Sequence, residues 1–320
     1  MHIAGLMLPV FAVIVTGWIV GRLAILPRSL ADGLVQFAYY VAMPALLFSV
    51  VAKEPTAAMF DLPFLASFGG GSLLVWALVG AGSLVLARRG AALATVDGLA
   101  AAMTNTGFVA LPVLHGMFGQ RALLPAAIAT LFVAVVMFPL GVILLERSRG
   151  AARGAALPPT AILRHTLTNP MVAPTLLGLA YAAAGLTLPG MVDNYLGVLA
   201  GALTPCALFA IGLGLQIDDI RHNAWEAGLL AAIKLLGLPG LVLAIAIELQ
   251  LSPFSAVAAV ICAAVPTAKT LFILSSEYDT GRELAAATIA LTTLASVGSL
   301  LAWLVVLAHL YPSVFPVSPG

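Results

Sequence analysis

Lys269 is the residue of this chain best suited to bind an anion, because it lies in the middle of an apolar segment. It belongs to the stretch AAVPTAKT at residues 263–270, inside an apolar run over residues 253–276. A lysine at the centre of a membrane helix costs roughly 2.5–3.5 kcal/mol, so such lysines are usually paired or functional. The acidic residues all fall at or near the ends of apolar runs, so we expect no carboxylate of the protein near Lys269. We therefore expect the carboxylate of a substrate to be the counter-ion of Lys269.

Pro266 favours the same chemistry. Proline is well placed in the first turn of a helix, where an N–H group has no intrahelical partner in any case. If Pro266 begins a half-helix, the next three N–H groups lie at the positive end of the helix dipole and point toward a bound anion. These groups belong to Thr267, Ala268 and Lys269. The substrate-binding residues that we predict in this segment are Pro266, Thr267, Lys269 and Thr270.

A second polar break occurs in the stretch MTNTGFVALP at residues 103–112. Glycine weakens a helix, and proline removes an amide donor and clashes with the preceding turn, so this segment is predicted to unwind near the middle of the bilayer. The remaining predicted substrate-binding residues are Thr104, Asn105, Thr106, Gly107 and Pro112 of this segment, and Pro205 of another apolar run. His115 follows the break. It is a candidate for a residue that gains and loses a proton during transport; the alternative is a role in packing or at the membrane interface.

Other roles stay open for these residues. A proline within a membrane helix often only kinks it. Lys269 can instead neutralise backbone carbonyl groups of the broken helix, or substitute for a coupling cation. The second lysine within an apolar run, Lys234, is expected to extend its ammonium group toward the cytoplasmic interface.

The composition places these residues in a membrane. Of the 320 residues, 62% are hydrophobic and 8% are charged, whereas soluble domains carry about a quarter charged residues. A membrane span needs roughly 20 mostly apolar residues. The segments that qualify cover residues 3–21, 30–51, 62–87, 95–118, 122–146, 168–188, 192–215, 225–249, 253–276 and 284–311. The net charge of +1 gives no general field for a nucleic acid partner.

Basic residues divide unequally between alternate connections of these segments. One set of connections holds Arg22, Arg28, Arg88, Arg89, Arg147, Arg149, Arg153, Arg164, Arg221 and Arg282, and the other holds Lys53 and Arg121. Cytoplasmic loops of membrane proteins are enriched in lysine and arginine. The pattern predicts a protein of the inner (cytoplasmic) membrane with both termini outside and a cytoplasmic loop over residues 147–165.

The two halves of the chain match at a single offset of 161 residues. Gly17 falls on Gly178, the run MPALLF at 43–48 falls on TPCALF at 204–209, and Thr106 falls on Thr267. One offset that serves several segments indicates an internal repeat.

Each unit of this repeat contains five spans, an odd number, so the second copy must be inverted. Inverted repeats with a midplane site between interrupted helices are typical of secondary transporters. We predict a first five-helix repeat over residues 1–149, a cytoplasmic linker over 150–167 and a second repeat over 168–320. At the offset of 161, Asn105 corresponds to Pro266, and the two breaks should face each other.

Several motifs, in order along nearly the whole chain, resemble the auxin efflux carrier family in its bacterial branch. They are YYVAMPALLF at 39–48, NTGFVALPV at 105–113, NP at 169–170, PCALFAIGLGL at 205–215 and VPTAKTLFILSSEYD at 265–279. The resemblance implies an all-α membrane protein of ten helices, with a fold like that of bile-acid transporters, in which the broken fourth and ninth helices cross. It also implies transport of molecules with a carboxylate, such as auxin, malate or malonate. Family members often have an asparagine shortly after the ninth-helix proline, where this chain has Lys269 and Thr270; the difference suits a small dianion, as in malonate-type carriers.

We therefore predict a secondary active or facilitative transporter of small mono- or dicarboxylates that works by alternating access. An ion antiporter for Na+ or H+ on the same plan, with Lys269 in place of a cation, is the alternative. The sequence contains no HExxH, no GxSxG and no pair of mid-span aspartates, which argues against an enzyme. We expect no cofactor, no metal and no nucleic acid; the expected partners are the substrate and the lipid bilayer, and a homodimer stays open.

Overall fold

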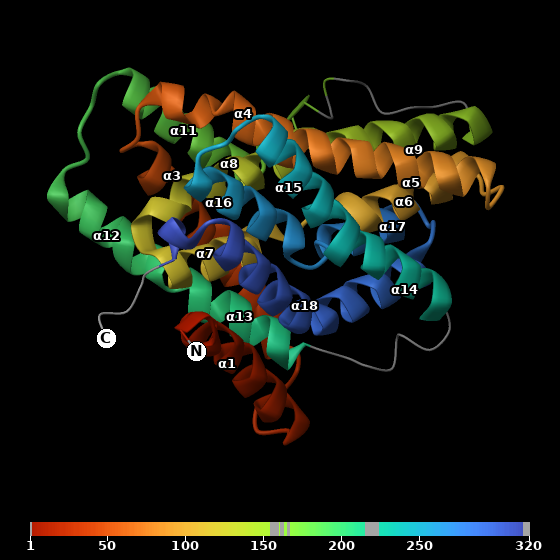
Figure 1. Ribbon diagram of the computed structural model, residues 1–320, viewed down its shortest axis with the longest axis horizontal. Coiled ribbons are helices and arrows are strands. Elements are labelled where there is room, and N and C mark those ends of the chain that lie inside the picture. Colours follow the sequence, from red (N-terminus) through yellow and green to blue (C-terminus); the bar gives the residue numbers. More distant parts are fainter. Residues whose placement is uncertain (1, 154–159, 161–162, 165–166, 215–223, 316–320) are drawn as a thin grey trace.

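The computed structural model describes residues 2–153, 160, 163–164, 167–214 and 224–315, with the side chains of residues 2–11 and 149–153 left aside. Over these residues the regular structure is helical, and the one β-bridge joins Thr104 to Thr267 (Figure 1). Most of the predicted linker over 150–167 lies outside the described residues, as does Arg221. The chain is all-α, as predicted.

The helices follow the predicted intervals closely. In the first half they are α1 (His2–Arg22), α2 (Leu30–Phe37), α3 (Met43–Val51), α4 (Leu62–Phe64), α5 (Gly71–Val85), α6 (Ala91–Ala102), α7 (Leu111–Phe118), α8 (Leu123–Phe132) and α9 (Phe138–Arg153). In the second half they are α11 (Val172–Ala183), α12 (Gly190–Gly201), α13 (Leu203–Leu213), α14 (Ala224–Ala232), α15 (Leu238–Glu248), α16 (Pro253–Ala264), α17 (Thr270–Glu277) and α18 (Arg282–Leu310).

Several of these helices are suited to cross a membrane. Among the described residues, 6 continuous helical runs are long and apolar enough to do so, and four shorter apolar helices accompany them. The longest run, Thr106–Ser148, contains a sharp turn at Gly119, whose φ of 67° is left-handed and therefore suits glycine. This turn coincides with the predicted connection between the fourth and fifth segments.

Prolines set a recurring local distortion in these helices. A proline cannot donate to the carbonyl group four residues earlier and clashes with it, so the preceding turn widens. Four π-helical turns end two residues before a proline: Ala38–Ala42 before Pro44, Thr106–Ala110 before Pro112, Val133–Met137 before Pro139, and Ile233–Gly237 before Pro239. Each of these four prolines thus follows a distorted helical turn.

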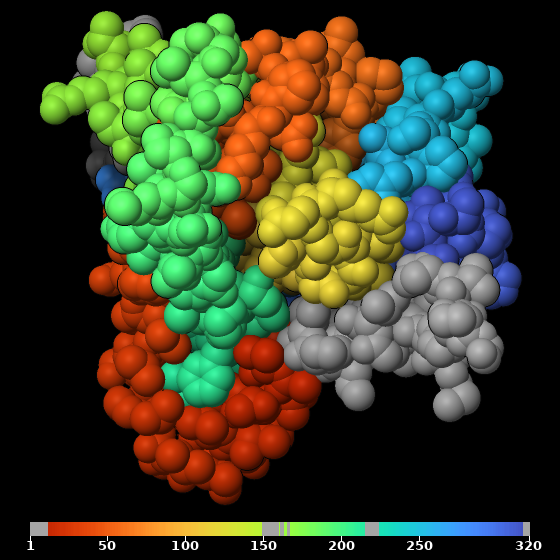
Figure 2. Space-filling view, turned by 90° about the vertical axis from the view of Figure 1, so that its left-hand side faces the viewer, coloured from red at the N-terminus to blue at the C-terminus, as the bar shows by residue number. Residues whose placement is uncertain are grey.

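Helices of the two halves pack against each other in two groups. In one group α1 lies along α13, and α3 lies against α11 and α12 (Figure 1); Figure 2 shows the red N-terminal segment against the green segment of α12 and α13. In the other group α5 contacts α6 and α15, while α16 contacts α8, α15 and α18.

The second group contains the most deeply buried helices. Every residue from Ala94 to Ala102 of α6 and from Ala256 to Ala264 of α16 is buried. Both segments are rich in alanine, which lets neighbouring backbones approach closely, and apart from Thr95 and Asp97 of α6 they are apolar. Each of these two helices leads directly into one of the predicted breaks, so the breaks lie in the interior of the protein.

Candidate functional site

The two broken segments cross and form hydrogen bonds with each other. After α6 and α16 end, the backbone is extended at Met103 and at Val265, and Thr104 pairs with Thr267 in an antiparallel bridge. The N–H group of Asn105 donates to the carbonyl oxygen of Pro266 at 2.9 Å, and the N–H group of Ala268 donates to that of Met103 at 2.9 Å. These bonds satisfy backbone groups that the helix breaks would otherwise leave unpaired in a buried place.

The start of the second half-helix differs from the prediction. Pro266 is not its first residue; α17 begins at Thr270, with Lys269 at the N-cap. The N–H group of Thr267 donates to Oγ1 of Thr292 at 3.2 Å, and that of Ala268 is bonded to Met103. The prediction of free N–H groups at Thr267 and Ala268 is therefore wrong, because Met103 of the first break and Thr292 of α18 supply their acceptors.

The first break is also shorter than predicted. Only Met103 to Asn105 leave the helical conformation; Thr106 begins a π-helical turn, and Pro112 lies in the first turn of α7. Gly107 packs closely against Met43: a Cβ atom at residue 107 would lie 2.8 Å from Cε and 3.0 Å from Sδ of Met43, so this side chain would have to shift.

The two threonines of the bridge have different surroundings. The Thr267 hydroxyl donates to the carbonyl oxygen of Ala100 at 2.8 Å, near the C-terminal end of α6, so this side chain stabilises the crossing itself. The Thr104 side chain is 1% exposed, and its Oγ1 has no hydrogen-bond partner within the described residues. A buried hydroxyl without a partner costs about 1–3 kcal/mol. The two hydroxyls therefore differ, because that of Thr267 is bonded within the crossing and that of Thr104 is not.

Lys269 lies at the edge of this crossing. It is exposed, its Nζ would lie 4.0 Å from a Cβ atom at Gly214, and the charge of Asp32 acts on it. The expectation that no carboxylate lies nearby is therefore wrong, because α2 brings Asp32 close. The two residues do not form an ion pair within 4.0 Å among the described residues, so the ammonium group stays available to a ligand.

The other predicted site residues divide between the crossing and its surroundings. Thr270 opens α17, and its Oγ1 makes a weak contact of 3.8 Å with Sδ of Met103. The side chain of Asn105 is 7% exposed. Pro205 is exposed in the first turn of α13, and His115 is partly exposed in the last turn of α7.

Lys234 is the residue at the crossing whose role the sequence analysis missed. Its side chain is 0% exposed, and its Nζ donates to the carbonyl oxygens of Ala263 and Val265 at 2.6 Å each. The expected extension toward the membrane interface is therefore wrong, because the end of α16 offers acceptors in the interior. The signal was present in the sequence, since the energetic argument applied to Lys269 holds equally for a second lysine in an apolar run.

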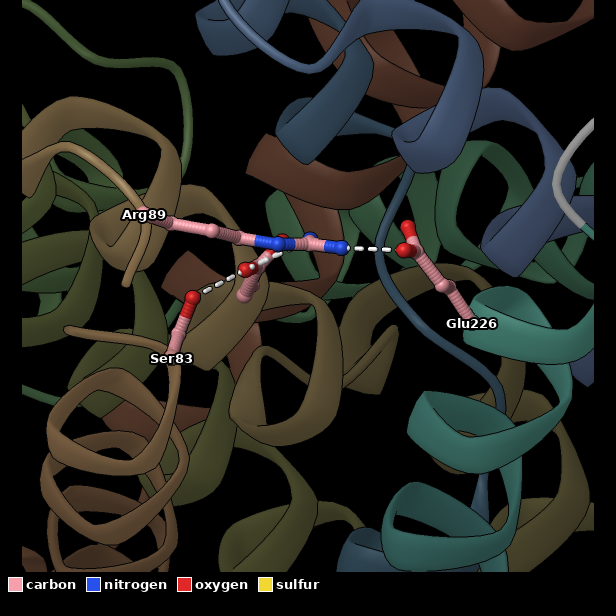
Figure 3. A network of polar contacts seen from close by, with 4 residues as sticks. Ser83, Arg89 and Glu226 are labelled. Carbon is pink, nitrogen blue, oxygen red and sulfur yellow. Dashed lines mark hydrogen bonds and ion pairs between the residues drawn. The ribbon is translucent and has the colours of Figure 1, made fainter. Parts of the chain in front are cut away.

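A separate polar network joins the α5–α6 connection to α14 (Figure 3). Oδ2 of Asp97 accepts hydrogen bonds from Ser83 Oγ at 2.5 Å and from Arg89 Nη1 at 2.9 Å, and Arg89 also pairs with Glu226. The hydrogen bond to Glu226 is the main cause of a raised pKa of the Arg89 guanidinium. Arg89 and Glu226 border a cavity of about 500 Å³ with Asp279, Arg282 and Glu283. This cavity lies among helix ends and does not include the crossing.

The chain is similar to known membrane proteins over most of its length. A sequence profile described as "Membrane transport protein" matches residues 2–304. The chain belongs to this family of membrane transport proteins. The match confirms the resemblance to the auxin efflux carriers and, with the helices described above, a multi-pass membrane protein.

Three relatives of this transport family cover nearly the whole chain. The "Putative malonate transporter" of Rhizobium meliloti is 31% identical over 93% of this chain and 93% of its own length. An "Uncharacterized transporter" of Methanothermobacter thermautotrophicus is 28% identical over 94% of this chain and 97% of its own. The "Uncharacterized transporter YfdV" of Escherichia coli K12 is 24% identical over 94% of this chain and 96% of its own. All three are named transporters, which agrees with the prediction of a protein that is not an enzyme.

Proposed function

We propose that this protein transports small carboxylate anions, with malonate or a similar dicarboxylate as the first candidate, by alternating access around the crossing of the two broken segments. The observation that carries the proposal is the position of Lys269, which is exposed at the N-cap of α17 beside the Thr104–Thr267 bridge. Charge-assisted hydrogen bonds from an ammonium group to a carboxylate are stronger than neutral ones. The name of the Rhizobium relative supports malonate as the first ligand to test.

The binding site in this proposal combines one charge with neutral polar groups. Lys269 is the ionic partner of the carboxylate, and the unpartnered hydroxyl of Thr104 is a hydrogen-bond donor. Asn105 and Thr106 complete the polar surface at the first break, while Thr270 lies at the start of α17. Pro112, Gly107, Pro266 and Thr267 shape the backbone around these groups. Pro205 and His115 have no assigned contact with the ligand.

Alternating access follows in this proposal from two inverted five-helix repeats, residues 1–149 and 168–320, within ten spans. The reciprocal packing of α1 with α13 and of α3 with α11 supports it, because each contact joins one half to the other. In this proposal α1–α3 and α11–α13 form one body and the remaining helices form the body that contains the crossing. Both termini lie outside, and the loop over residues 147–165 lies in the cytoplasm of a cell whose inner membrane holds the protein.

Counterflow in proteoliposomes tests the function. Labelled malonate should enter vesicles loaded with malonate, and Lys269→Ala should abolish this uptake, while Lys269→Arg should keep part of it because the positive charge remains. Lys53→Ala is the matched control, since Lys53 is an exposed lysine that pairs with Asp193 on α12. Undiminished uptake of every tested mono- and dicarboxylate by Lys269→Ala contradicts the proposal. Flux of Na+ driven by a pH gradient, without anion counterflow, would instead identify the ion antiporter.

A further inference from the structure

The carbonyl oxygens that Lys234 binds are made available by the break itself. In a continuous helix the N–H group of Thr267 would bond the carbonyl oxygen of Ala263, four residues earlier. Here that N–H group donates to Thr292 on α18. The C-terminal end of α16 therefore presents free carbonyl oxygens with the negative end of the helix dipole, and this end lies inside the protein.

Unwound carbonyl groups and the C-terminal ends of half-helices are the places where secondary transporters commonly coordinate a coupling cation. In this chain the Nζ of Lys234 lies at such a place, 2.6 Å from the oxygens of Ala263 and Val265. No described carboxylate forms an ion pair with Lys234.

The protein holds Lys234 in this position through its backbone. Lys234 belongs to the π-helical turn Ile233–Gly237, which the following Pro239 imposes. The indole Nε1 of Trp303 donates to the carbonyl oxygen of Leu235 at 2.8 Å and so fixes this turn to α18. The same helix supplies Thr292, which bonds the amide of Thr267. Both sides of the lysine site are thus anchored on α18.

We propose that the ammonium group of Lys234 occupies the place of a coupling cation at the end of α16, so that this protein forms its anion site without Na+. The inference rests on the proposed function: if the crossing binds an anion, the charge of Lys234 adds to that of Lys269 there. Lys234 acts through the backbone of residues 263–265 and is a positioning residue. The ammonium group of Lys234 contacts backbone carbonyl oxygens, whereas that of Lys269 is the one that binds the ligand in the proposed function.

Thermal unfolding of the purified protein in sodium chloride and in choline chloride, at matched ionic strength, tests this directly. The wild-type protein should unfold at the same temperature in both salts. Lys234→Ser should unfold at a lower temperature in choline chloride and recover by roughly 2–4 °C in sodium chloride, because Na+ enters the vacated place and stabilises the folded form. The serine hydroxyl is small and adds an oxygen ligand.

Two further variants separate this explanation from general destabilisation. Lys234→Met removes the charge but fills the same space, so it should lower the unfolding temperature without any response to Na+. Lys269→Ala, at the exposed lysine, should show no response to Na+ either. Two results overturn the proposal. One is an unfolding temperature of the wild-type protein that is higher in sodium chloride than in choline chloride; the other is an unfolding temperature of Lys234→Ser that, like that of Lys234→Met, does not change between the two salts. If neither variant folds in either salt, the wild-type comparison decides alone.

This readout does not depend on transport. Failure of malonate uptake with the expected sodium response in Lys234→Ser would refute the proposed substrate and leave the cation replacement standing. Uptake of malonate by the wild-type protein that requires Na+ would refute the cation replacement and leave the substrate standing. The two proposals are therefore separable.

Discussion

The backbone amide of Asn105 donates to the carbonyl oxygen of Pro266 at 2.9 Å, and these two residues are 161 positions apart. This is the offset at which the two halves of the sequence match. In an antiparallel crossing of two repeats related by a two-fold axis, the pair on the axis must consist of equivalent residues. The Asn105–Pro266 pair meets that condition, which supports the proposed inverted repeat.

A second relationship at the same offset involves Gly17 and Gly178. A Cβ atom at Gly17 would lie 2.3 Å from the carbonyl oxygen of Phe209, and one at Gly178 would lie 3.0 Å from that of Phe48. Phe48 and Phe209 are also 161 positions apart. Each glycine thus allows a helix of one half to contact a helix of the other half, and the contact recurs in both directions.

Gly17→Ala and Gly178→Ala should both destabilise the protein. The added methyl group would overlap a backbone carbonyl oxygen in Gly17→Ala and would be crowded against the backbone of Phe48 in Gly178→Ala; overpacking typically costs about 1–3 kcal/mol. Gly17→Ala should have the larger effect, because its methyl group meets a carbonyl oxygen at 2.3 Å. Thermal unfolding in detergent, followed by tryptophan fluorescence, measures the order.

Gly82→Ala is the control for these variants. Gly82 lies within α5, and a Cβ atom there would meet nothing within 4 Å. Alanine is the better helix former by about 0.5–1 kcal/mol, so this variant should unfold at the same or a higher temperature. Equal unfolding temperatures for Gly17→Ala and Gly82→Ala would show that the close approach of α1 to α13 does not contribute to stability.

Thr104→Val should weaken carboxylate binding without lowering stability. The hydroxyl of Thr104 is buried without a partner, so its removal should leave the unfolding temperature unchanged or raise it. If this hydroxyl donates to the bound carboxylate, a hydrogen bond to a charged group is lost, worth about 1.5–3 kcal/mol. Titration of the purified protein with malonate should then show a dissociation constant raised roughly tenfold or more.

Two other threonines distinguish a role in binding from a role in packing. Thr288 on α18 is also fully buried with an unpartnered hydroxyl, so Thr288→Val should match Thr104→Val in stability but keep normal malonate affinity. Thr267→Val removes the hydrogen bond to Ala100 and should lower the free energy of unfolding by about 1 kcal/mol. Normal affinity in Thr104→Val would remove Thr104 from the site.

The positions of the breaks could be predicted because their causes are local. Pro112 and Pro266 have no N–H group to donate, Gly107 adds flexibility, and polar residues lie within a few positions of each proline inside an apolar run. The offset of 161 residues further predicted which parts of the two breaks would meet. These are properties of nearby residues and of the repeat, which a single sequence contains.

The hydrogen-bond partners at the crossing could not be predicted, because they come from distant segments. The N–H group of Thr267 donates to Thr292, and its hydroxyl donates to the carbonyl oxygen of Ala100. Lys234 donates to a carbonyl oxygen at the end of α16. No spacing rule relates these partners. The same holds for Asp32, which reaches Lys269 only because α2 packs against α13, so the true start of α17 and the surroundings of its lysine needed the structure.

Asp32→Asn should strengthen the binding of a dicarboxylate. Asp32 is exposed and lies close enough for its negative charge to act on Lys269, so its neutralisation raises the positive potential at the site. The interaction is screened by solvent, and the gain in affinity should stay within about threefold at low salt and decline as salt is added. Malonate titrations at two salt concentrations measure it.

A double-mutant cycle assigns this effect to Lys269. In the Lys269→Ala background the substitution Asp32→Asn should change malonate affinity far less than in the wild-type background, because the two charges act on each other. An equal gain in both backgrounds would mean that Asp32 acts on the ligand by another route, and Lys269 would lose its place as the mediator.

Asp97→Asn should destabilise the protein more than Glu226→Gln, although both carboxylates pair with Arg89. The side chain of Asp97 is 4% exposed and accepts a second hydrogen bond from Ser83, so neutralising it leaves a buried network unbalanced at a cost of about 3 kcal/mol or more. The side chain of Glu226 is 45% exposed, and an ion pair in that setting contributes about 0–1 kcal/mol. Unfolding temperatures should therefore fall clearly for Asp97→Asn and hardly for Glu226→Gln. The reverse order would mean that the contact with α14, and not the buried bond within the α5–α6 hairpin, stabilises this part of the protein.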